Sequence, residues 1–254
     1  MLIFNYKGLI KSSVLIKLSK FDQNTPEFLN NLSELAKLKE TLGDYDISLL
    51  VVSNEDKFEN ILFKINQKLH NNLINIDIIK HSMEDTLGYK SFCGDFTLFR
   101  EYKLLEPNMK YELNKYELKI IKTLKDKPNI SYNELSKKTG MSYLRLRKII
   151  TNLEDNNLIR FSIDPNYEKL NLEFHNILLR INISHSKQFE KNMINNPNVH
   201  WIKKGIGKWD YILSIATRNI KEFIDVTQQI RTQNKDIIFD FSTLVSKINI
   251  MRKY

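Results

Sequence analysis

The sequence predicts an α+β protein in which two β-α-β-β-α-β domains stand on either side of a helical insert. Three observations support this fold class. Strand and helix patterns alternate through residues 174–254, the same order recurs in residues 1–100, and a basic helical segment separates the two copies. At 254 residues, the chain is long enough for two or three domains, each with a core of its own.

Residues 174–254 have the order of a ferredoxin-like domain. Segment 177–183 is apolar enough for a buried strand, and apolar residues alternate with polar or small ones in segment 209–216. Ser186 and Asn219 are placed to cap the two helices. The other expected strands are 199–206 and 237–248, and the apolar helix positions are Phe189, Met193, Ile194, Ile220, Phe223, Ile224 and Ile230.

Residues 1–100 repeat this order as a second ferredoxin-like domain. Strands are expected at 14–18, 35–42, 47–52 and 73–79, although the composition of 35–42 would also suit a helix. Thr25 and Asn54 are placed to cap the helices. Their apolar positions are Phe28, Leu29, Leu32, Phe58, Ile61, Leu62, Ile65 and Leu69.

A glycine-containing turn links the two copies. The sequence GDYD at 43–46 aligns with GKWD at 207–210, an offset of 164 residues. Glycine suits a tight turn because it adopts a positive φ without steric cost. Self-similarity at a fixed offset indicates a duplicated domain with a segment inserted between the copies.

The insert, residues 107–165, has the pattern of a winged helix-turn-helix. Asn114 is placed to cap a helix, and Ser131 with Glu134 has the spacing of a capping box at a second, short helix. Gly140 then stands where a sharp turn needs a positive φ, and Ser142 is placed to cap a third helix. The apolar positions are Leu118, Ile120, Ile121 and Leu124 in the first helix and Leu146, Ile150 and Leu153 in the third.

The end of the insert and its charge complete this pattern. Segments 158–161 and 163–165 are predicted to form the strand and turn of a wing. The chain carries a net charge of +9, and twelve Lys or Arg against six Asp or Glu lie between Pro107 and Arg160, a net of +6. Most of the excess charge is therefore confined to the insert, which favours an anionic partner there.

Several of these motifs resemble the leucine-responsive regulatory protein/AsnC (feast/famine) family of transcription regulators. The insert carries ELSKKTGMS at 134–142, then LE at 153–154 and LI at 158–159, and GKWDYIL at 207–213 is similar to the family's G-x-x-D-Y-x-L turn and strand. There are departures: Ile149 stands where the family usually has Arg, and Asn157 where it has Gly. In this sequence, a helix-turn-helix pattern precedes only the second copy.

The resemblance implies a sequence-specific regulator that binds double-stranded DNA. The candidate DNA contacts lie on the second and third helices of the insert, with Lys137 and Lys138 better suited to phosphates than to bases. Tyr132 and Tyr143 could donate to phosphate or simply pack. A solvated basic helix face is the alternative interpretation of the whole set. The candidate residues are Lys137, Lys138, Ser142, Tyr143, Arg145, Arg147 and Lys148.

A small effector such as an amino acid is a further implication of the resemblance. Glycines let a charged ligand approach backbone N–H groups, and a carboxylate can bind an ammonium. The alternative is that the glycines only permit tight turns and that the aspartates cap them. The candidate effector residues are Gly43, Asp46, Gly205, Gly207 and Asp210; the opposite charges of Asp44 and Lys208 predict different ligands for the two turns.

The resemblance also implies assembly, because domains of this type pair across two chains in the family. Here one chain holds both halves, so the two domains are expected to pair within it. One helix-turn-helix reads one half-site, so a homo-oligomer is expected for a palindrome.

Other classes are disfavoured. A single cysteine, Cys93, rules out an intrachain disulfide and a cysteine zinc cage, and the five histidines show no metal-binding spacing. We expect no cofactor, and by default a buried thiol at Cys93. No apolar run reaches the roughly 18 residues of a membrane helix, and no secretory signal is evident, so a cytoplasmic protein is expected.

Two alternatives remain. The two-domain plan also resembles that of haem-pathway decarboxylases, which use a His-x-Tyr-x-Arg run, whereas the corresponding stretch here, 199–204, reads VHWIKK. The chain could also be a partner subunit that tunes a full-length regulator.

Overall fold

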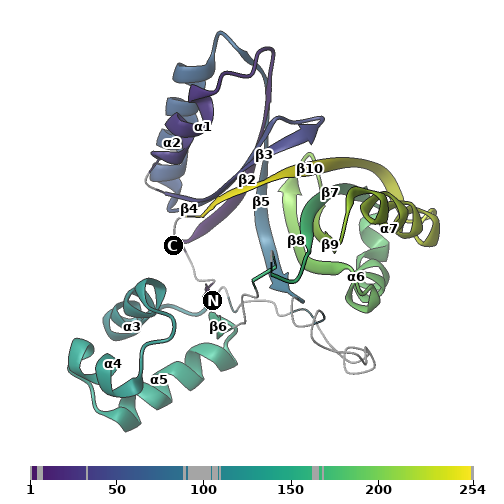
Figure 1. Ribbon diagram of the computed structural model, residues 1–254. Helices are drawn as coiled ribbons and strands as arrows, with labels where there is room; N and C mark the ends of the chain where they lie inside the picture. The colour runs from purple at the N-terminus through teal and green to yellow at the C-terminus, as the bar shows by residue number, and fades with distance from the viewer. Residues whose placement is uncertain are drawn as a thin grey trace. The chain divides into compact units, whose positions relative to one another are not determined.

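The structure is a computed structural model that describes residues 2–4, 8–32, 34–87, 90, 104, 108, 110–161, 166, 167 and 169–252 (Figure 1). It divides into two compact units: residues 1–9 and 105–164 with Tyr254, and residues 10–104 and 165–253. The predicted domain limits at 100, 107 and 165, the wing turn at 163–165 and Cys93 lie outside the described residues.

The larger unit consists of two successive β-α-β-β-α-β repeats. The first comprises β2 (Ile10–Leu18), α1 (Asn24–Asn30), β3 (Leu35–Gly43), β4 (Ile47–Ser53), α2 (Glu55–Leu69) and β5 (Leu73–Thr86). The second comprises β7 (Glu173–Ile181), a 3₁₀ turn (Ile183–His185), α6 (Ser186–Asn195), β8 (Val199–Gly207), β9 (Tyr211–Thr217), α7 (Ile220–Gln233) and β10 (Ile238–Arg252).

The eight strands of the two repeats close into one barrel, in the order β10-β3-β4-β2-β5-β8-β9-β7. At each of the two seams, the fourth strand of one repeat pairs antiparallel with the second strand of the other: β5 with β8, and β10 with β3. Closure pairs the backbone groups that two separate sheets would leave exposed at their edges. The two copies therefore pair within the chain, as expected.

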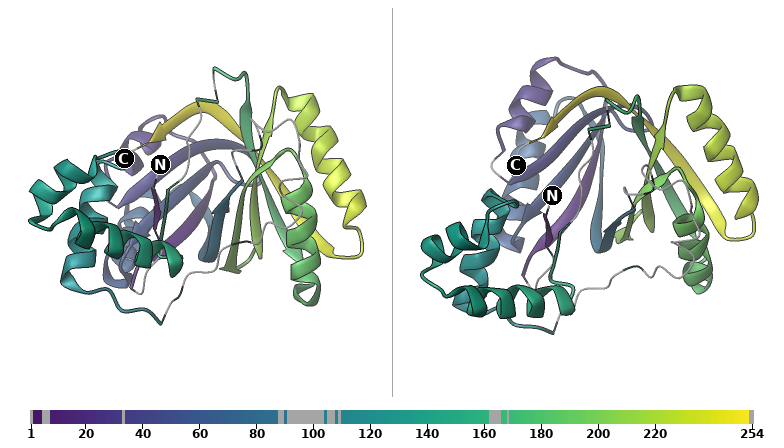
Figure 2. Two further views of the ribbon diagram at one scale, coloured as in Figure 1. Left: turned by 90° about the horizontal axis from the view of Figure 1, so that it is seen from below. Right: turned by 60° about the horizontal axis from the view of Figure 1, so that its bottom comes forward.

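Each repeat has its own core, between its half of the barrel and its two helices (Figure 2). A third cluster lies on the inner face of the barrel and draws residues from both repeats. In β2, Val14 and Ile16 belong to the core beneath the helices, whereas Leu15 between them belongs to the inner cluster. The strand is thus buried on both faces, which explains its continuous apolar run.

The smaller unit is the helix-turn-helix with a short β-ribbon. It comprises α3 (Lys115–Asp126), α4 (Tyr132–Thr139), α5 (Tyr143–Asp155), β6 (Ile159–Phe161) and β1 (Leu2–Phe4). β1 pairs antiparallel with β6, so that Leu2 lies opposite Phe161. The sequence analysis had placed these first residues with the N-terminal domain; instead they give the wing strand the partner that an isolated three-residue strand lacks.

The predicted fold class is confirmed, with local differences. β5 and β10 run further than predicted, because each pairs first within its own repeat and then across a seam. Asn54 and Asn219 are the N-caps predicted, but helix α1 starts after Gln23, and α6 follows a 3₁₀ turn that ends at His185.

The predicted apolar face of α7 is also partly wrong. Ile220 and Ile224 are 45% and 53% exposed, and Val226 and Thr227 are buried with Phe223 instead. Phe223 and Ile230 are buried as predicted, so the face that packs on the sheet is rotated about the helix axis away from Ile220 and Ile224. No helix among the described residues is both long and apolar enough to span a membrane.

Candidate nucleic-acid interface

The first two helices of the insert begin at capping residues. Asn114 Oδ1 accepts the backbone N–H of Glu117 (3.1 Å), and Glu117 Oε2 accepts that of Asn114 (2.8 Å), so α3 carries a full capping box. At α4, Ser131 Oγ accepts the N–H of Glu134 (3.2 Å), but the Glu134 carboxylate pairs with Lys127 (3.1 Å). The capping box predicted at α4 is therefore only half formed, because the nearby ammonium competes for the carboxylate.

The turn between α4 and α5 is fixed by its backbone and by two side chains. Gly140 has φ 73° and ψ 22°, the left-handed conformation predicted for it. Ser136 Oγ donates to the carbonyl of Met141 (2.6 Å), and Lys119 Nζ donates to that of Thr139 (3.0 Å). These bonds satisfy the last carbonyl of α4 and one carbonyl of the turn that follows it.

Helix α5 buries one stripe and exposes the opposite face, as predicted. Leu146, Ile150 and Leu153 are at most 3% exposed and share a core with residues of α3 and α4. Ser142 occupies the N-cap position, but its hydroxyl makes no capping bond. Asn157 has φ 54°, so it takes the left-handed conformation that its place in the motif requires.

The five candidate cations are all exposed: Lys137 and Lys138 on α4, and Arg145, Arg147 and Lys148 on α5. No described acidic side chain forms an ion pair with any of them. At 100° per residue, Lys148 points almost directly away from the buried stripe, and Arg147 lies on the flank toward α4. Lys148 is therefore presented to solvent on the outward face of α5, with Arg147 at the edge of that face.

Arg145 differs from its neighbours on α5. Its guanidinium lies over the ring of Tyr116 on α3, 4.5 Å from the ring centroid. On the other side of α5, the Tyr143 ring meets that of Tyr132 with centroids 5.1 Å apart. Burial raises the pKa of Tyr132, and Glu154 raises it further. Both tyrosines thus pack, and Tyr143 remains 48% exposed.

Leu144 is a surface residue that the sequence analysis did not single out. It is 76% exposed, between the candidate residues Tyr143 and Arg145. Its position could have been found from the sequence, because it falls outside the stripe of Leu146, Ile150 and Leu153. An exposed aliphatic side chain can contact a thymine methyl group, which the major groove displays.

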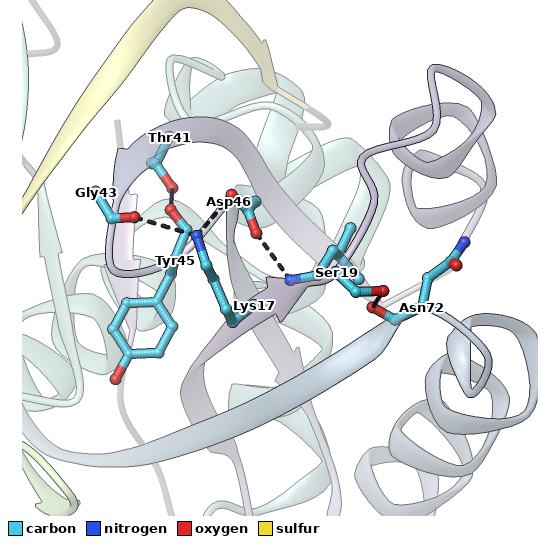
Figure 3. Close-up of polar contacts among 8 residues, drawn as sticks. Lys17, Ser19, Thr41, Gly43, Tyr45, Asp46 and Asn72 are labelled. Atoms are coloured by element: carbon cyan, nitrogen blue, oxygen red, sulfur yellow. Dashed lines mark hydrogen bonds and ion pairs between the residues drawn. The ribbon is translucent and has the colours of Figure 1, made fainter.

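The first glycine turn, between β3 and β4, is held by Asp46 (Figure 3). Its Oδ2 accepts the backbone N–H of Leu18 (2.8 Å), and its Oδ1 accepts Lys17 Nζ (3.1 Å). Lys17 also donates to the carbonyl of Gly43 (3.3 Å). The carboxylate predicted to bind an effector is thus bonded to its own domain.

The second turn, between β8 and β9, repeats this arrangement. Asp210 Oδ2 accepts the backbone N–H of Ile181 (2.9 Å), the counterpart of the Leu18 bond. In both repeats, the aspartate ties the turn to the first strand of the repeat. These contacts agree with the turn-capping alternative, and an effector role for either aspartate stays a prediction.

The glycines stand where the strands of the other repeat approach. A Cβ on Gly43 would lie 2.4 Å from the carbonyl oxygen of Thr243 in β10, and one on Gly207 would lie 2.2 Å from that of Ile78 in β5. A Cβ on Gly205 would lie 2.6 Å from the side chain of Ile79. The structure therefore places these candidate effector residues at the seams of the barrel.

Residues at equivalent positions of the two turns meet inside the barrel. Trp209 Nε1 donates to the hydroxyl of Tyr45 (3.1 Å), and Tyr45 donates to Asp77 Oδ2 (2.5 Å). Lys208 Nζ donates to both oxygens, at 3.0 Å each. Burial and the bond to Asp77 raise the pKa of Tyr45, while the bonds to Tyr45 and Asp77 raise the pKa of Lys208 to about 12.

Comparison with known proteins supports the nature of the insert. Residues 113–160 match the family described as winged helix-turn-helix DNA-binding. An uncharacterized HTH-type transcriptional regulator of Pyrococcus furiosus is 27% identical over 113 residues, which are 43% of this chain and 76% of that protein. One of Pyrococcus abyssi is 28% identical over 146 residues, which are 54% of this chain and 97% of that protein.

Solved structures extend the fold comparison to the whole chain. The siroheme decarboxylase NirDL aligns with 99% of this chain and 76% of its own, with a TM-score of 0.64 and 11% identity. An AsnC family transcriptional regulator from Agrobacterium tumefaciens covers 56% of this chain and 94% of its own, with a TM-score of 0.45 and 21% identity. The insert is thus a winged helix-turn-helix DNA-binding domain, and the chain is related to HTH-type transcriptional regulators.

Proposed function

We propose that this chain is a sequence-specific DNA-binding transcription regulator of the leucine-responsive/AsnC type. The observation that carries the proposal is the outward face of α5, where Arg147 and Lys148 are exposed while Leu146, Ile150 and Leu153 are buried. A helix held in this way can enter the major groove, with cations toward phosphates and base edges. The family match of residues 113–160 and the two Pyrococcus regulators support it.

Each candidate side chain has a distinct role in this proposal. Arg147 and Lys148 approach base edges or phosphates. The Tyr143 hydroxyl and the Ser142 hydroxyl, which makes no capping bond, contact the DNA beside them. Lys137 and Lys138, in the last turn of α4, contact phosphates. Arg145 acts from its place over Tyr116, which limits how far it reaches.

A binding experiment with genomic DNA fragments across a salt series tests this proposal. The double variant Arg147→Ala/Lys148→Ala should bind at least about tenfold more weakly, and its salt slope should fall by about 0.9 for each of the two residues that contacts a phosphate. Lys64→Ala, an exposed lysine of α2, is the matched control and should change neither value. Equal binding by the double variant and the wild type would refute the assignment of α5.

We also propose that the regulator acts as a homo-oligomer. Two half-sites need two DNA-reading helices, and the described residues of one chain hold one helix-turn-helix. Sedimentation with and without operator DNA measures the assembly. A monomer that keeps full specific affinity would contradict it, and DNA binding only in the presence of another regulator would instead favour the role of a tuning subunit.

The fold match with NirDL raises an enzyme as the second candidate. His200 is the histidine in the stretch compared with haem-pathway decarboxylases. It is 3% exposed, and its ring contacts those of Tyr167 and Phe174, with centroids 5.9 and 5.5 Å away. Burial, with Lys90, lowers its pKa to about 4. Because an enclosed histidine is poorly placed to meet a substrate, titration with an iron porphyrin carboxylate should produce no new absorption band.

A further inference from the structure

The inside of the barrel contains a small polar cavity that no part of the proposed function uses. It measures about 40 Å³, and residues of both repeats line it. Since a water molecule needs roughly 10–15 Å³ measured in this way, the cavity has room for about three waters or one small organic molecule. Its described lining residues are Ser13, Leu15, Lys37, Lys39, Ser48, Leu49, Leu50, Asn176, Leu178, Lys203, Ile212, Ser214 and Leu244.

The charge of this lining has one sign. It includes three lysines and, among the described residues, no acid. Lys39 is only 5% exposed and donates to Ser246 Oγ (3.2 Å). Lys203 lies 3.5 Å from Glu84, whose carboxylate also serves Lys11 at 3.1 Å. Glu84 thus pairs with two ammonium groups, that of Lys11 and that of the lining residue Lys203.

His81, next to the cavity, is also affected by the charge of Lys203. His81 accepts or donates a bond to Ser13 Oγ (2.9 Å), a lining residue. Burial lowers the pKa of His81 to about 3, and Lys203 is the next largest cause. His81 is therefore neutral and adds no further positive charge beside the lysines.

The uncharged part of the lining combines an amide donor with aliphatic side chains. Ser214 Oγ donates to Asn176 Oδ1 (2.8 Å), which leaves the Asn176 amide NH₂ as a donor at the cavity wall. Leu15, Leu178 and Leu244 supply aliphatic surface from three strands. Ammonium and amide donors beside leucines suit an anion with a short hydrocarbon chain better than an inorganic ion.

We propose that the barrel interior binds a short-chain aliphatic carboxylate, with its carboxylate held by Lys39 of the first repeat and Lys203 of the second. The site is distinct from the glycine turns and does not depend on DNA binding. Because both repeats contribute a lysine, the bound carboxylate stabilises the closed barrel. A ligand that binds only the folded state raises the unfolding temperature by mass action.

Calorimetric titration and thermal unfolding of the full chain with propionate test the site. Propionate should release or absorb heat and raise the unfolding temperature, whereas propylamine, of similar size and opposite charge, should do neither. Inorganic phosphate should bind more weakly because it cannot use the leucines. Lys39→Met and Lys203→Met should each weaken propionate binding by at least about tenfold, the loss of one hydrogen bond to a charged group.

Controls separate the site from general salt effects. Lys221→Met removes an exposed lysine of α7 and should leave propionate binding unchanged. Should a methionine variant fail to fold, Asn176→Ala, which removes the amide donor without touching a charge, provides a second measurement and should weaken binding severalfold. No heat and no shift with propionate, or equal shifts in Lys39→Met and the wild type, would overturn the proposal while leaving the DNA-binding assignment intact.

Discussion

The two glycine turns share their backbone contacts and differ in their side-chain contacts. In each, a glycine lies against a carbonyl of the other repeat, and an aspartate accepts a backbone N–H from the first strand of its own repeat. At the two middle positions, the first turn has Asp44 and Tyr45 where the second turn has Lys208 and Trp209. The glycine and the aspartate that hold each turn at the barrel seam are thus identical in the two copies. The aromatic residues that meet inside the barrel, Tyr45 and Trp209, are different and bond to each other.

The largest effect on stability is expected from adding a side chain at the seams of the barrel, where each turn glycine lies against the other repeat. Gly207→Ala and Gly43→Ala each place a Cβ within 2.4 Å of a backbone oxygen, at φ 156° and 131°. A backbone carbonyl in a sheet cannot move aside cheaply, so each variant should lower the free energy of unfolding by about 3 kcal/mol or more. Urea unfolding followed by circular dichroism measures it.

Gly8→Ala is the control for backbone strain alone. Gly8 has φ 85°, but nothing lies within 4 Å of its added Cβ. The variant should therefore cost only the left-handed conformation, roughly 1–2 kcal/mol. If the Gly207 and Gly8 variants unfold equally easily, the glycines serve local turn geometry and the seam explanation is wrong.

The aspartates give the next largest effect. Asp210→Ala leaves the N–H of Ile181 without its partner, and Asp46→Ala does the same to Leu18. An unsatisfied backbone donor costs about 1–3 kcal/mol, so both variants should be destabilised by that amount. Chemical unfolding of the two variants, side by side, measures this cost.

The same pair of variants bears on the effector prediction. An effector site at the turns requires that Asp46 or Asp210 affect ligand binding more than stability. Binding of a candidate amino acid to the wild type, lost in Asp210→Ala at full folded population, would support a ligand role for the turn. Destabilisation without any change in ligand binding would confirm the capping role.

Each repeat also buries a histidine near a lysine, and these histidines make the stability of the protein depend on pH. Burial lowers the pKa of His81 to about 3, with Lys203 adding to the shift, and lowers that of His200 to about 4, with Lys90 adding. Both groups are neutral when folded and gain a proton more readily when unfolded. Stability should therefore fall as the pH drops from about 6.5 toward 4.

A single substitution isolates one contribution. His81→Gln should reduce the acid loss by up to about 1.4 kcal/mol per pH unit over that range, because one fewer proton is taken up on unfolding. Unfolding curves at stepped pH measure the slope. A slope equal to that of the wild type would contradict the prediction, because it would mean that His81 takes up no extra proton on unfolding.

The sequence predicted the elements of each repeat because their signals are local. Asn54 and Asn219 cap helices as expected, Gly140 takes its positive φ, and Leu146 lies inside α5. These features depend on residues within one or two helical turns of each other. The same locality identified the exposed cations Arg147 and Lys148.

What the sequence could not predict depends on contacts between different elements. The close approach of Gly43 to Thr243 joins residues 200 positions apart, and no pattern near Gly43 announces it. Glu134 was expected to close a capping box, but a lysine seven residues earlier takes its carboxylate. From the sequence, Arg145 was expected to be an exposed cation with no contact, but in the structure its guanidinium lies over the ring of Tyr116 on α3.

The smallest expected effect separates the two turns most directly. Of the two turn aspartates, Asp46 alone forms an ion pair among the described residues; it pairs with Lys17, and the two side chains are 24% and 34% exposed. A partly exposed pair contributes about 0.5 kcal/mol and is screened by salt. Lys17→Met should therefore lower stability by that amount at low salt and by less at high salt, measured by urea unfolding at two ionic strengths. Arg180→Met, the exposed residue before Ile181 in the second repeat, should show no such salt dependence. If both variants respond to salt alike, the Lys17–Asp46 ion pair does not distinguish the two aspartates, and the turns differ only in Asp44, Tyr45, Lys208 and Trp209.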